Sequence, residues 1–283
     1  MNMEKLVESI SLAADSQRSE AADYINPADG LLYCGKCNTP KEAYFPAGLS
    51  LLGKNKHSAD CRCAAERRAQ QEAEKQERDR RIRIAGLRAE AFREMPAAGW
   101  RFDKAPIMTA QLATIQRYAE RWEDFRENHS GLLLYGGVGT GKSYAAGCVA
   151  NALIDRCVSV LFVGLPDLIS RMQGNFGADR DNIIKQITRP ELLILDDLGA
   201  ERNTSYGKER LYDVINHRWL TGKPMIVTTN LTLSYLRKPG DIEEQRIFDR
   251  ILEVCVPVKF DGDSFRQHNA AANLKKAADL LNG

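Results

Sequence analysis

A glycine-rich segment that ends in lysine and serine matches the GxxxxGK[ST] pattern of a phosphate-binding loop. An apolar run, residues 131–135, precedes the segment, and a helix-like run, residues 144–155, follows it. Glycines let successive N–H groups turn toward a polyphosphate, and the start of a helix adds partial positive charge. We therefore predict a site for ATP or ADP, against the alternative of a glycine-rich turn with an ordinary surface lysine. The residues that would hold the nucleotide are Gly136, Gly137, Val138, Gly139, Thr140, Gly141, Lys142, Ser143 and Tyr144.

Two side chains of this loop have defined chemical roles in such a site. The ammonium of Lys142 would contact the β- and γ-phosphates, and the hydroxyl of Ser143 would bind Mg²⁺. Lys142 is therefore also a candidate catalytic residue.

Polar residues follow two later strand-like runs of the sequence. Residues 192–195 are apolar and end in Asp196 and Asp197, at the edge where a parallel sheet places its ligands. We assign Asp196 to Mg²⁺ and Asp197 to the attacking water, against the alternative of two surface acids without a function. Residues 225–229 lead into Asn230, which would hydrogen-bond a phosphate or that water.

An amphipathic run, residues 245–251, carries two arginines one turn apart, Arg246 and Arg250. One interpretation is surface ion pairing along a helix. The other is an arginine supplied to a neighbouring subunit, where a planar cation stabilises the charge of a transferring phosphoryl group. For that second role we favour Arg250.

Four cysteines in the first quarter of the chain form a candidate metal site. They stand as a CxxC pair and a CxC pair, and two such pairs supply four thiolates to one tetrahedral Zn²⁺ with a structural role. His57 lies close enough to replace one thiolate, and free thiols are the alternative to a metal site. The expected zinc ligands are Cys34, Cys37, Cys61 and Cys63. We expect Cys148, Cys157 and Cys255 to be small core residues.

The composition divides the 283 residues into three parts. Residues 1–63 hold the four cysteines, residues 64–99 form a charged helical connector, and residues 100–283 alternate strand-like and helix-like runs. This alternation predicts an α/β domain with a parallel sheet flanked by helices. The net charge of +2 gives no sign of a nucleic-acid partner, and without an apolar run of membrane length or a signal peptide we expect a cytoplasmic protein.

The connector mixes charges of both signs at helical spacing. Such a pattern is typical of a solvated helix that separates two modules, and Met95 and Pro96 should end it. Residues 80–83, with three arginines, could instead contact a phosphate backbone or an acidic partner.

Together these motifs resemble the AAA+ ATPases of the DnaC and IstB group. The resemblance rests on residues 136–143, on the strand into 196–199, on 216–218, on the strand into 228–230 and on 246–250. The cysteine-bearing part looks most like the DnaC-type replicative helicase loaders of bacteria, phages and prophages. The match covers about residues 100–266 well and the first third of the chain loosely.

The resemblance implies an oligomeric ATPase that loads a hexameric replicative helicase onto single-stranded DNA. Residues 1–63 would contact the helicase, Asn230 would be the sensor 1 residue and Arg250 the arginine finger. An extra helix that faces DNA would lie within residues 167–188. The candidate phosphate contacts there are Arg171, Arg180 and Lys185, with simple solvation of that face as the alternative.

Two features depart from the family pattern. Asp197 stands where most members have glutamate, which predicts slow hydrolysis and leaves Glu201 as a candidate helper. The chain after Arg250 is too short for a separate helical lid, so Arg266 is the only nearby candidate for the sensor 2 arginine.

The sequence favours a helicase-loading ATPase with a zinc-stabilised first module. The alternatives are a transposase-helper ATPase of the IstB type and an adaptor that binds ATP with little hydrolysis. A small-molecule kinase with a phosphate-binding loop is a further alternative, but the sequence shows no evident acceptor pocket.

Overall fold

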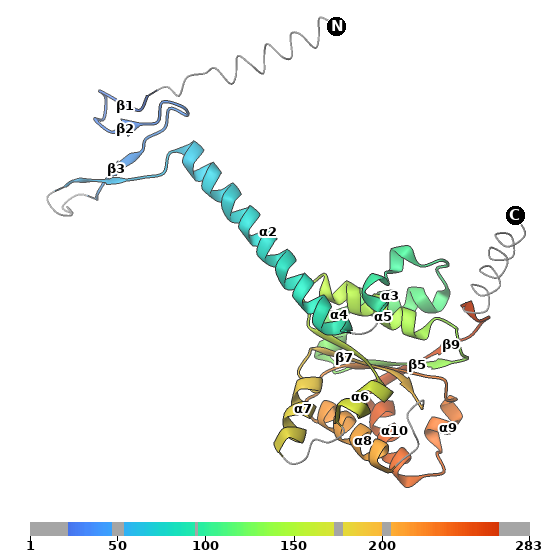
Figure 1. The fold of residues 1–283 in the computed structure, drawn as a ribbon. Coiled ribbons are helices and arrows are strands. Elements are labelled where there is room, and N and C mark those ends of the chain that lie inside the picture. The colour runs from blue at the N-terminus through green and yellow to red at the C-terminus, as the bar shows by residue number, and fades with distance from the viewer. Residues whose placement is uncertain (1–21, 47–53, 94–95, 173–177, 200–204, 266–283) are drawn as a thin grey trace, which may run out of the picture. The chain divides into compact units, whose positions relative to one another are not determined.

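The computed structural model describes residues 22–46, 54–93, 96–172, 178–199 and 205–265 (Figure 1). The chain divides into two compact units, Met1–Asp79 and Arg80–Gly283. Within the described residues, no helix is both long and apolar enough to cross a membrane.

The first unit contains two small antiparallel ladders. β1 (Tyr24–Ile25) pairs with β2 (Leu32–Tyr33), and β3 (Glu42–Tyr44) pairs with β4 (Lys56–Ser58). Strands this short bury little apolar surface, so they do not make a core of their own. Four cysteines gather beside these strands.

The helix α2 (Arg62–Phe92) begins in the first unit and ends in the second. Its alanine, glutamate, glutamine and arginine residues are strong helix formers, and most of its side chains are exposed, as expected for the connector. Only its last turns are apolar on one face, where Ala91 and Phe92 are buried in the core of the second unit. These turns are fixed by charge as well, because Arg88 and Arg101 both donate to the carboxylate of Asp155.

The second unit is built on a five-stranded parallel sheet with strand order β6-β7-β8-β5-β9. The strands are β5 (Gly131–Gly136), β6 (Val160–Gly164), β7 (Leu192–Leu198), β8 (Met225–Thr229) and β9 (Cys255–Phe260). β5, β7 and β8 correspond to the three strand-like runs named in the sequence, and the parallel sheet with helices on both faces confirms the α/β fold.

Helices cover both faces of this sheet (Figure 1). On one face lie α3 (Ala110–Glu120), α4 (Trp122–Glu127) and α5 (Lys142–Ile154). On the other lie α6 (Leu165–Met172), α7 (Ala178–Thr188), α8 (Ser205–Leu220), α9 (Leu233–Arg237) and α10 (Ile242–Val254). Two short 3₁₀ turns, η1 (Pro96–Gly99) and η2 (Phe102–Lys104), connect α2 to α3.

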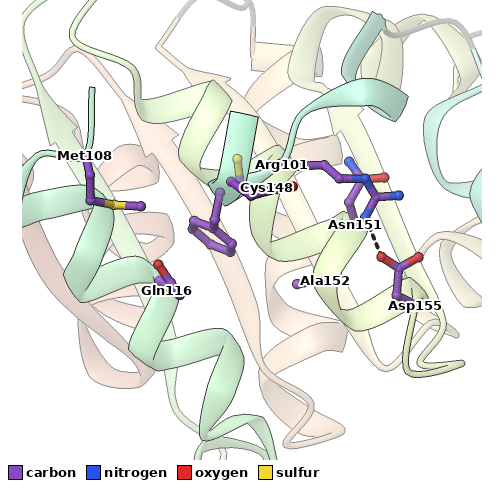
Figure 2. A pocket seen from close by; sticks show the side chains of 9 residues that line it. Arg101, Met108, Gln116, Cys148, Asn151, Ala152 and Asp155 are labelled. Carbon is purple, nitrogen blue, oxygen red and sulfur yellow. Dashed lines mark hydrogen bonds and ion pairs between the residues drawn. The ribbon is translucent and has the colours of Figure 1, made fainter. Parts of the chain in front are cut away.

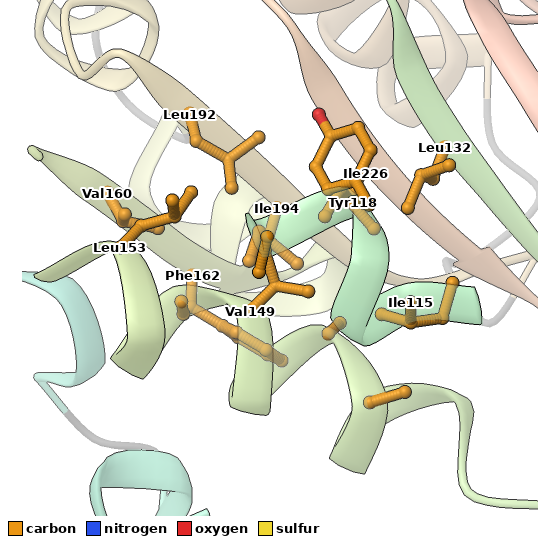
Figure 3. Close-up of a cluster of buried hydrophobic side chains, with 14 of the residues drawn as sticks. Ile115, Tyr118, Leu132, Val149, Leu153, Val160, Phe162, Leu192, Ile194 and Ile226 are labelled. Atoms are coloured by element: carbon orange, nitrogen blue, oxygen red, sulfur yellow. The ribbon is translucent and has the colours of Figure 1, made fainter. Parts of the chain in front are cut away.

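Alternate residues of each central strand enter different cores. In β5, Leu132 and Leu134 join the cluster under α3 and α5, whereas Leu133 joins the cluster under α6, α8 and α10. Figure 3 shows the first cluster, in which Ile115 and Tyr118 of α3 lie against the sheet. Burial of each such leucine stabilises the fold by about 1.5–3 kcal/mol. The sheet therefore packs against helices through both of its faces.

Several boundaries differ from the sequence prediction. The helical stretch over residues 109–128 is interrupted at Arg121, so it forms two helices, α3 and α4. The segment 167–188, expected to contain an extra helix, forms both α6 and α7, and α10 extends at both ends beyond the amphipathic run, residues 245–251. The strand β9 was not predicted, because it is a half-exposed edge strand that contains Pro257.

Candidate functional site

The phosphate-binding loop lies between the end of β5 and the start of α5, as predicted. Gly136 begins it with φ of 140°, and a Cβ at this position would stand 2.1 Å from the carbonyl oxygen of Phe260 in β9. Only glycine allows that close approach. The unpredicted strand β9 therefore explains why the loop must start with this residue.

Lys142 is buried within the loop. Its ammonium donates to the carbonyl oxygens of Gly136 at 3.0 Å and Gly137 at 2.6 Å, and to the side-chain oxygen of Asn230 at 2.8 Å. The structure thus brings the lysine of the loop and the amide at the end of β8 into direct contact. Both residues were predicted to face the phosphates.

The two candidate Mg²⁺ ligands are also neighbours. The carboxylate of Asp196 is buried and accepts hydrogen bonds from the hydroxyls of Thr228, at 2.6 Å, and Ser143. Burial raises the pKa of Asp196, and these two hydrogen bonds oppose the rise. A hydroxyl and a carboxylate are hard oxygen ligands of the kind that Mg²⁺ prefers, so the pair fits the ion that ATP carries.

Asp197 leaves the regular strand geometry. Its φ is 61°, and the pairing of β7 with β8 shifts register between Leu195 and Leu198. Its N–H donates to the hydroxyl of Thr228 at 3.0 Å, which holds the turned backbone. Strained backbone of this kind gathers at functional sites, and here the turn places Asp197 in the wall of a cavity.

This nucleotide cavity has a volume of about 400 Å³. Residues 138–144 with Asp197 and Asn230 supply most of its polar lining. A further set of lining residues is apolar, as a planar base requires. The apolar wall consists of Trp100, Ala105, Pro106, Ile107, Leu112, Phe260 and Phe265.

The sequence prediction missed this apolar wall. Most of its residues come from the segment before α3 and from Phe265 after β9, where no helical or strand period marks them, and Leu112 of α3 and Phe260 of β9 complete it. The one available signal was the apolar run Ala105, Pro106 and Ile107 directly before a helix. α5 holds the wall in place, because Tyr144 donates to the carbonyl of Arg101 at 2.8 Å.

Gly147 of α5 completes this attachment. A Cβ on Gly147 would stand 2.4 Å from the ring of Trp100, so the indole packs directly on the helix backbone. The buried amide of Asn151 donates to the carbonyls of Ala97 and Trp100, both at 2.9 Å. The helix that carries Lys142 and Ser143 therefore also fixes Trp100 of the apolar wall.

A second cavity, of about 320 Å³, lies between the segment after η1 and α5 (Figure 2). Arg101 and Asp155 pair at one end of it, and Met108 and Gln116 lie at the other. Cys148 lines it with a buried thiol, whose pKa burial raises to about 12, so this cysteine is a core residue as expected. No residue predicted for catalysis or nucleotide binding lines this cavity.

The other two isolated cysteines differ from each other. Cys255 is buried in β9, as expected, and burial raises the pKa of its thiol. Cys157 is only half-buried, in a turn with φ of 63°, so the expectation of a core residue was wrong for it. Cys157 belongs to the turn after α5, and the next buried core residue along the chain is Val158.

Arg250 lies away from the nucleotide cavity of its own chain. It precedes β9, whose first residue, Cys255, pairs with Gly131 at the start of β5. The phosphate-binding loop follows the other end of β5. Arg250 and the nucleotide cavity therefore lie at opposite ends of the parallel strands. Arg246 is exposed on α10.

The expected DNA-facing segment corresponds to α6 and α7, which are both helical. Lys185 is exposed on α7. The side chains of Arg171 and Arg180 lie outside the described residues, as do Glu201 and Arg266.

The four predicted zinc ligands converge in the first unit. Their sulfur atoms all lie within 4.8 Å of one another, with 3.6 Å between Cys34 and Cys63 and 3.5 Å between Cys61 and Cys63. The first pair follows β2, and the second stands at the start of α2. Four converging thiols are the donor set of a structural zinc site.

Backbone contacts shape this cysteine cluster. Asn38, with φ of 53°, donates its N–H to the carbonyl of Cys34 at 2.8 Å and closes the turn of the CxxC pair. The hydroxyl of Thr39 lies 3.0 Å from the Cys37 sulfur and accepts the N–H of Arg62 at 2.9 Å. His57 lies in β4 and is not a member of the cluster, so the structure favours four cysteines over the alternative with histidine.

Comparison with known proteins agrees with this geometry. A family model described as IstB-like ATP binding protein matches residues 65–273. A protein of Mycobacterium tuberculosis, named as an ATP-binding protein in an insertion sequence, is 32% identical over 152 residues, which cover 52% of this chain and 59% of that protein. The replicative helicase loader DnaI of Bacillus subtilis is 25% identical over 264 residues, which cover 86% of this chain and 81% of that protein.

The fold has a solved counterpart. A crystal structure of DnaI matches with a TM-score of 0.51 and 24% identity, over 60% of this chain and 94% of that one. The resemblance to DnaC and IstB ATPases inferred from the motifs is thereby confirmed, and the family model spans more than half of the chain. The chain therefore belongs to the family of IstB-like ATP-binding proteins.

Proposed function

We propose that this protein uses ATP to load a replicative DNA helicase onto single-stranded DNA. The observation that carries the proposal is the extent of the likeness to DnaI of Bacillus subtilis, which covers 86% of this chain. That is more of the chain than Arg80–Gly283 comprises, so the likeness includes part of the cysteine-bearing unit.

The nucleotide cavity supports ATP hydrolysis as the driving reaction. The ammonium of Lys142 would bind the β- and γ-phosphates, and Ser143 and Asp196 would hold Mg²⁺, which would neutralise charge on the phosphate oxygens. Asp197 would orient a water for attack on the γ-phosphorus, the bond to the β–γ bridging oxygen would break, and ADP and phosphate would leave. Asn230 lies 2.8 Å from Lys142 and would contact the γ-phosphate or the water.

Arg250 would complete this site from a second copy. Arg250 lies near the start of the parallel strands, whereas the phosphate-binding loop follows their other end. This supports a role in trans, because the guanidinium cannot reach the nucleotide cavity of its own chain. Copies joined in this way would form an oligomer through their ATP sites.

The remaining parts have separate roles in the proposal. The cysteine cluster would hold a structural zinc that stabilises the first unit, and this unit would contact the helicase. Single-stranded DNA would contact α6 and α7, where Lys185 is exposed, or the exposed arginines of residues 80–83.

A transposase-helper ATPase is the second candidate. It is favoured by the M. tuberculosis relative, whose 32% identity exceeds the 25% of DnaI. That alignment spans only 152 residues, however, and gives no reason for the cysteine-bearing unit. An adaptor that binds ATP with little hydrolysis is a further alternative, consistent with an aspartate in place of glutamate at position 197.

Co-purification of the full-length chain with the replicative helicase of its host distinguishes these candidates. We expect a complex, measured by native mass spectrometry, that forms or changes stoichiometry with ATP. Lys142→Ala should remove the ATP dependence, whereas Lys259→Ala, on the exposed edge strand, should not. A complex with a transposase and none with the helicase would replace the loader with the transposition helper.

A further inference from the structure

Arg250 is held by aromatic rings instead of by an acid. Its guanidinium carbon lies 4.6 Å from the ring centre of Trp219 and 5.3 Å from that of Tyr212, both on α8. One guanidinium nitrogen donates to the Tyr212 hydroxyl at 3.2 Å. These distances are those of cation–π contacts, which fix the position of a cation without neutralising it.

The nearby carboxylate is kept away from this cation. Glu253, one turn further along α10, accepts a hydrogen bond from the indole N–H of Trp219 at 3.0 Å. Within the described part of the chain, no carboxylate lies within ion-pair distance of Arg250. Trp219 therefore positions the guanidinium of Arg250 with its ring and binds the carboxylate of Glu253 with its N–H. Both contacts leave the charge of Arg250 without an acidic partner from α10.

Another cation between the same two helices is treated differently. Lys208 belongs to α8, and its ammonium forms ion pairs with two acids at the start of α10. These acids are Asp241 and Glu244, the latter at 3.1 Å. That lysine joins α8 to α10 and its charge is balanced. Arg250 is thus a half-buried guanidinium with its charge available to an anion from outside the chain.

We propose that Tyr212 and Trp219 are positioning residues that present Arg250 to the nucleotide of a second copy of this chain. The inference rests on the proposed ATPase with its arginine supplied in trans. The polyphosphate is the complementary charge, and it lies at the opposite edge of the sheet, so the contact joins unlike faces of two copies. Apolar side chains stand at both faces: Leu220 beside Trp219, and Ile107 and Val138 at the nucleotide cavity, each more than 60% exposed.

The first test is the rate of ATP hydrolysis of Trp219→Leu at saturating ATP. Without the ring, Arg250 samples more rotamers and can pair with the freed Glu253, so kcat should fall about threefold to tenfold while KM for ATP stays within about twofold. Trp219→Phe keeps a ring face and should retain more of the rate than Trp219→Leu.

A matched control is available on the same helix. Tyr206 of α8 makes a similar cation–π contact, at 4.9 Å, with Arg210. Tyr206→Leu should not lower kcat in this way, and thermal unfolding of each variant shows whether the fold is intact. A loss of kcat that follows the loss of thermal stability across the three variants would mean that Trp219 only packs α8 against α10.

The second test mixes subunits and separates this inference from the proposed function. Asp197→Asn subunits keep an intact Arg250 but should not hydrolyse their own ATP. Mixed with Trp219→Leu subunits they should restore hydrolysis per Trp219→Leu cavity, just as they should for Arg250→Ala subunits. If Arg250→Ala is not rescued, the arginine does not act in trans and the proposed function loses that part. If Arg250→Ala is rescued but Trp219→Leu hydrolyses ATP at the full rate, the positioning role is wrong.

Discussion

The ammonium of Lys142 donates a 2.8 Å hydrogen bond to the side-chain oxygen of Asn230. Two carbonyl oxygens of the phosphate-binding loop accept from the same ammonium. A phosphate that binds to Lys142 must therefore compete with these oxygens, the side-chain oxygen of Asn230 among them. The contact links nucleotide binding to the end of β8.

Asn230→Ala should separate binding from hydrolysis. Removal of the amide takes away one competitor of the phosphates, so we expect ATP affinity to stay within about threefold of wild type. We expect kcat to fall at least about tenfold, because the variant loses a contact to the γ-phosphate or the water. Equilibrium binding of an ATP analogue and steady-state hydrolysis measure the two effects. An unchanged kcat would remove Asn230 from the catalytic residues.

We predict that the stability of the fold is less sensitive to loss of the charge of Asp197 than to a longer side chain at this position. Asp197→Asn keeps a residue type that accepts φ of 61°, so the fold should remain while hydrolysis falls about 100-fold. Asp197→Glu restores the usual acid of the family but places a longer side chain on left-handed backbone, at a cost of about 1 kcal/mol in the free energy of unfolding. Denaturant titration and ATPase rates distinguish the two. A Glu variant that is as stable as wild type and hydrolyses faster would show that the backbone does not select aspartate.

The cysteine cluster should contain about one zinc per chain as purified. Cys37→Ser removes one of four thiolates and should release most of the metal, as measured by elemental mass spectrometry. Cys157→Ser and His57→Ala are the controls, because neither residue belongs to the cluster. Full zinc in Cys37→Ser, or its loss in His57→Ala, would point to a different set of ligands.

Arg218 should contribute to stability without touching the nucleotide. Its side chain is fully buried in α8 and donates to four backbone carbonyl groups. Burial lowers the pKa of Arg218 to about 9, so it stays charged at neutral pH. Arg218→Met would leave those carbonyls without a donor and should lower the free energy of unfolding by at least about 3 kcal/mol. The carbonyls belong to Thr188, Pro190, Glu191 and Pro224.

Arg218→Lys keeps a charge with fewer donors and should be intermediate between wild type and Arg218→Met. Denaturant unfolding at pH 7 measures all three proteins. Equal stability of Arg218→Met and wild type would contradict this account of the buried guanidinium.

The sequence was sufficient to single out polar residues that the structure brings together at the phosphate-binding loop. Lys142, Asp196 and Asn230 each lie at the end of a buried strand or in a motif of fixed spacing, so local pattern determines where they stand. The sequence also predicted that the four cysteines lie together, because two close pairs are a usual arrangement of ligands in a tetrahedral metal site. The choice between His57 and a fourth thiol, however, depended on the register of β4 with β3.

The other features of the fold and the site depend on tertiary contacts, which the helical and strand periods of the sequence do not reveal. The strand β9 is half-exposed and contains Pro257, so it resembles a loop until β5 is found beside it. Most of the apolar wall, including Trp100 and residues 105–107, comes from segments outside the helices and strands. Arg250 was named from its motif, but its contact with Trp219 joins the ends of two helices far apart in the chain.

Helicase loading on circular single-stranded DNA tests the central claim most directly. A closed circle has no end for a ring to thread, so unwinding of an annealed oligonucleotide reports a loaded helicase. We expect the host replicative helicase to unwind it about tenfold faster or more with this protein and ATP, and not with Lys142→Ala, which should lose the phosphates. Unwinding that is the same with wild type, with Lys142→Ala and without either would contradict the proposal that this protein is an ATP-dependent helicase loader.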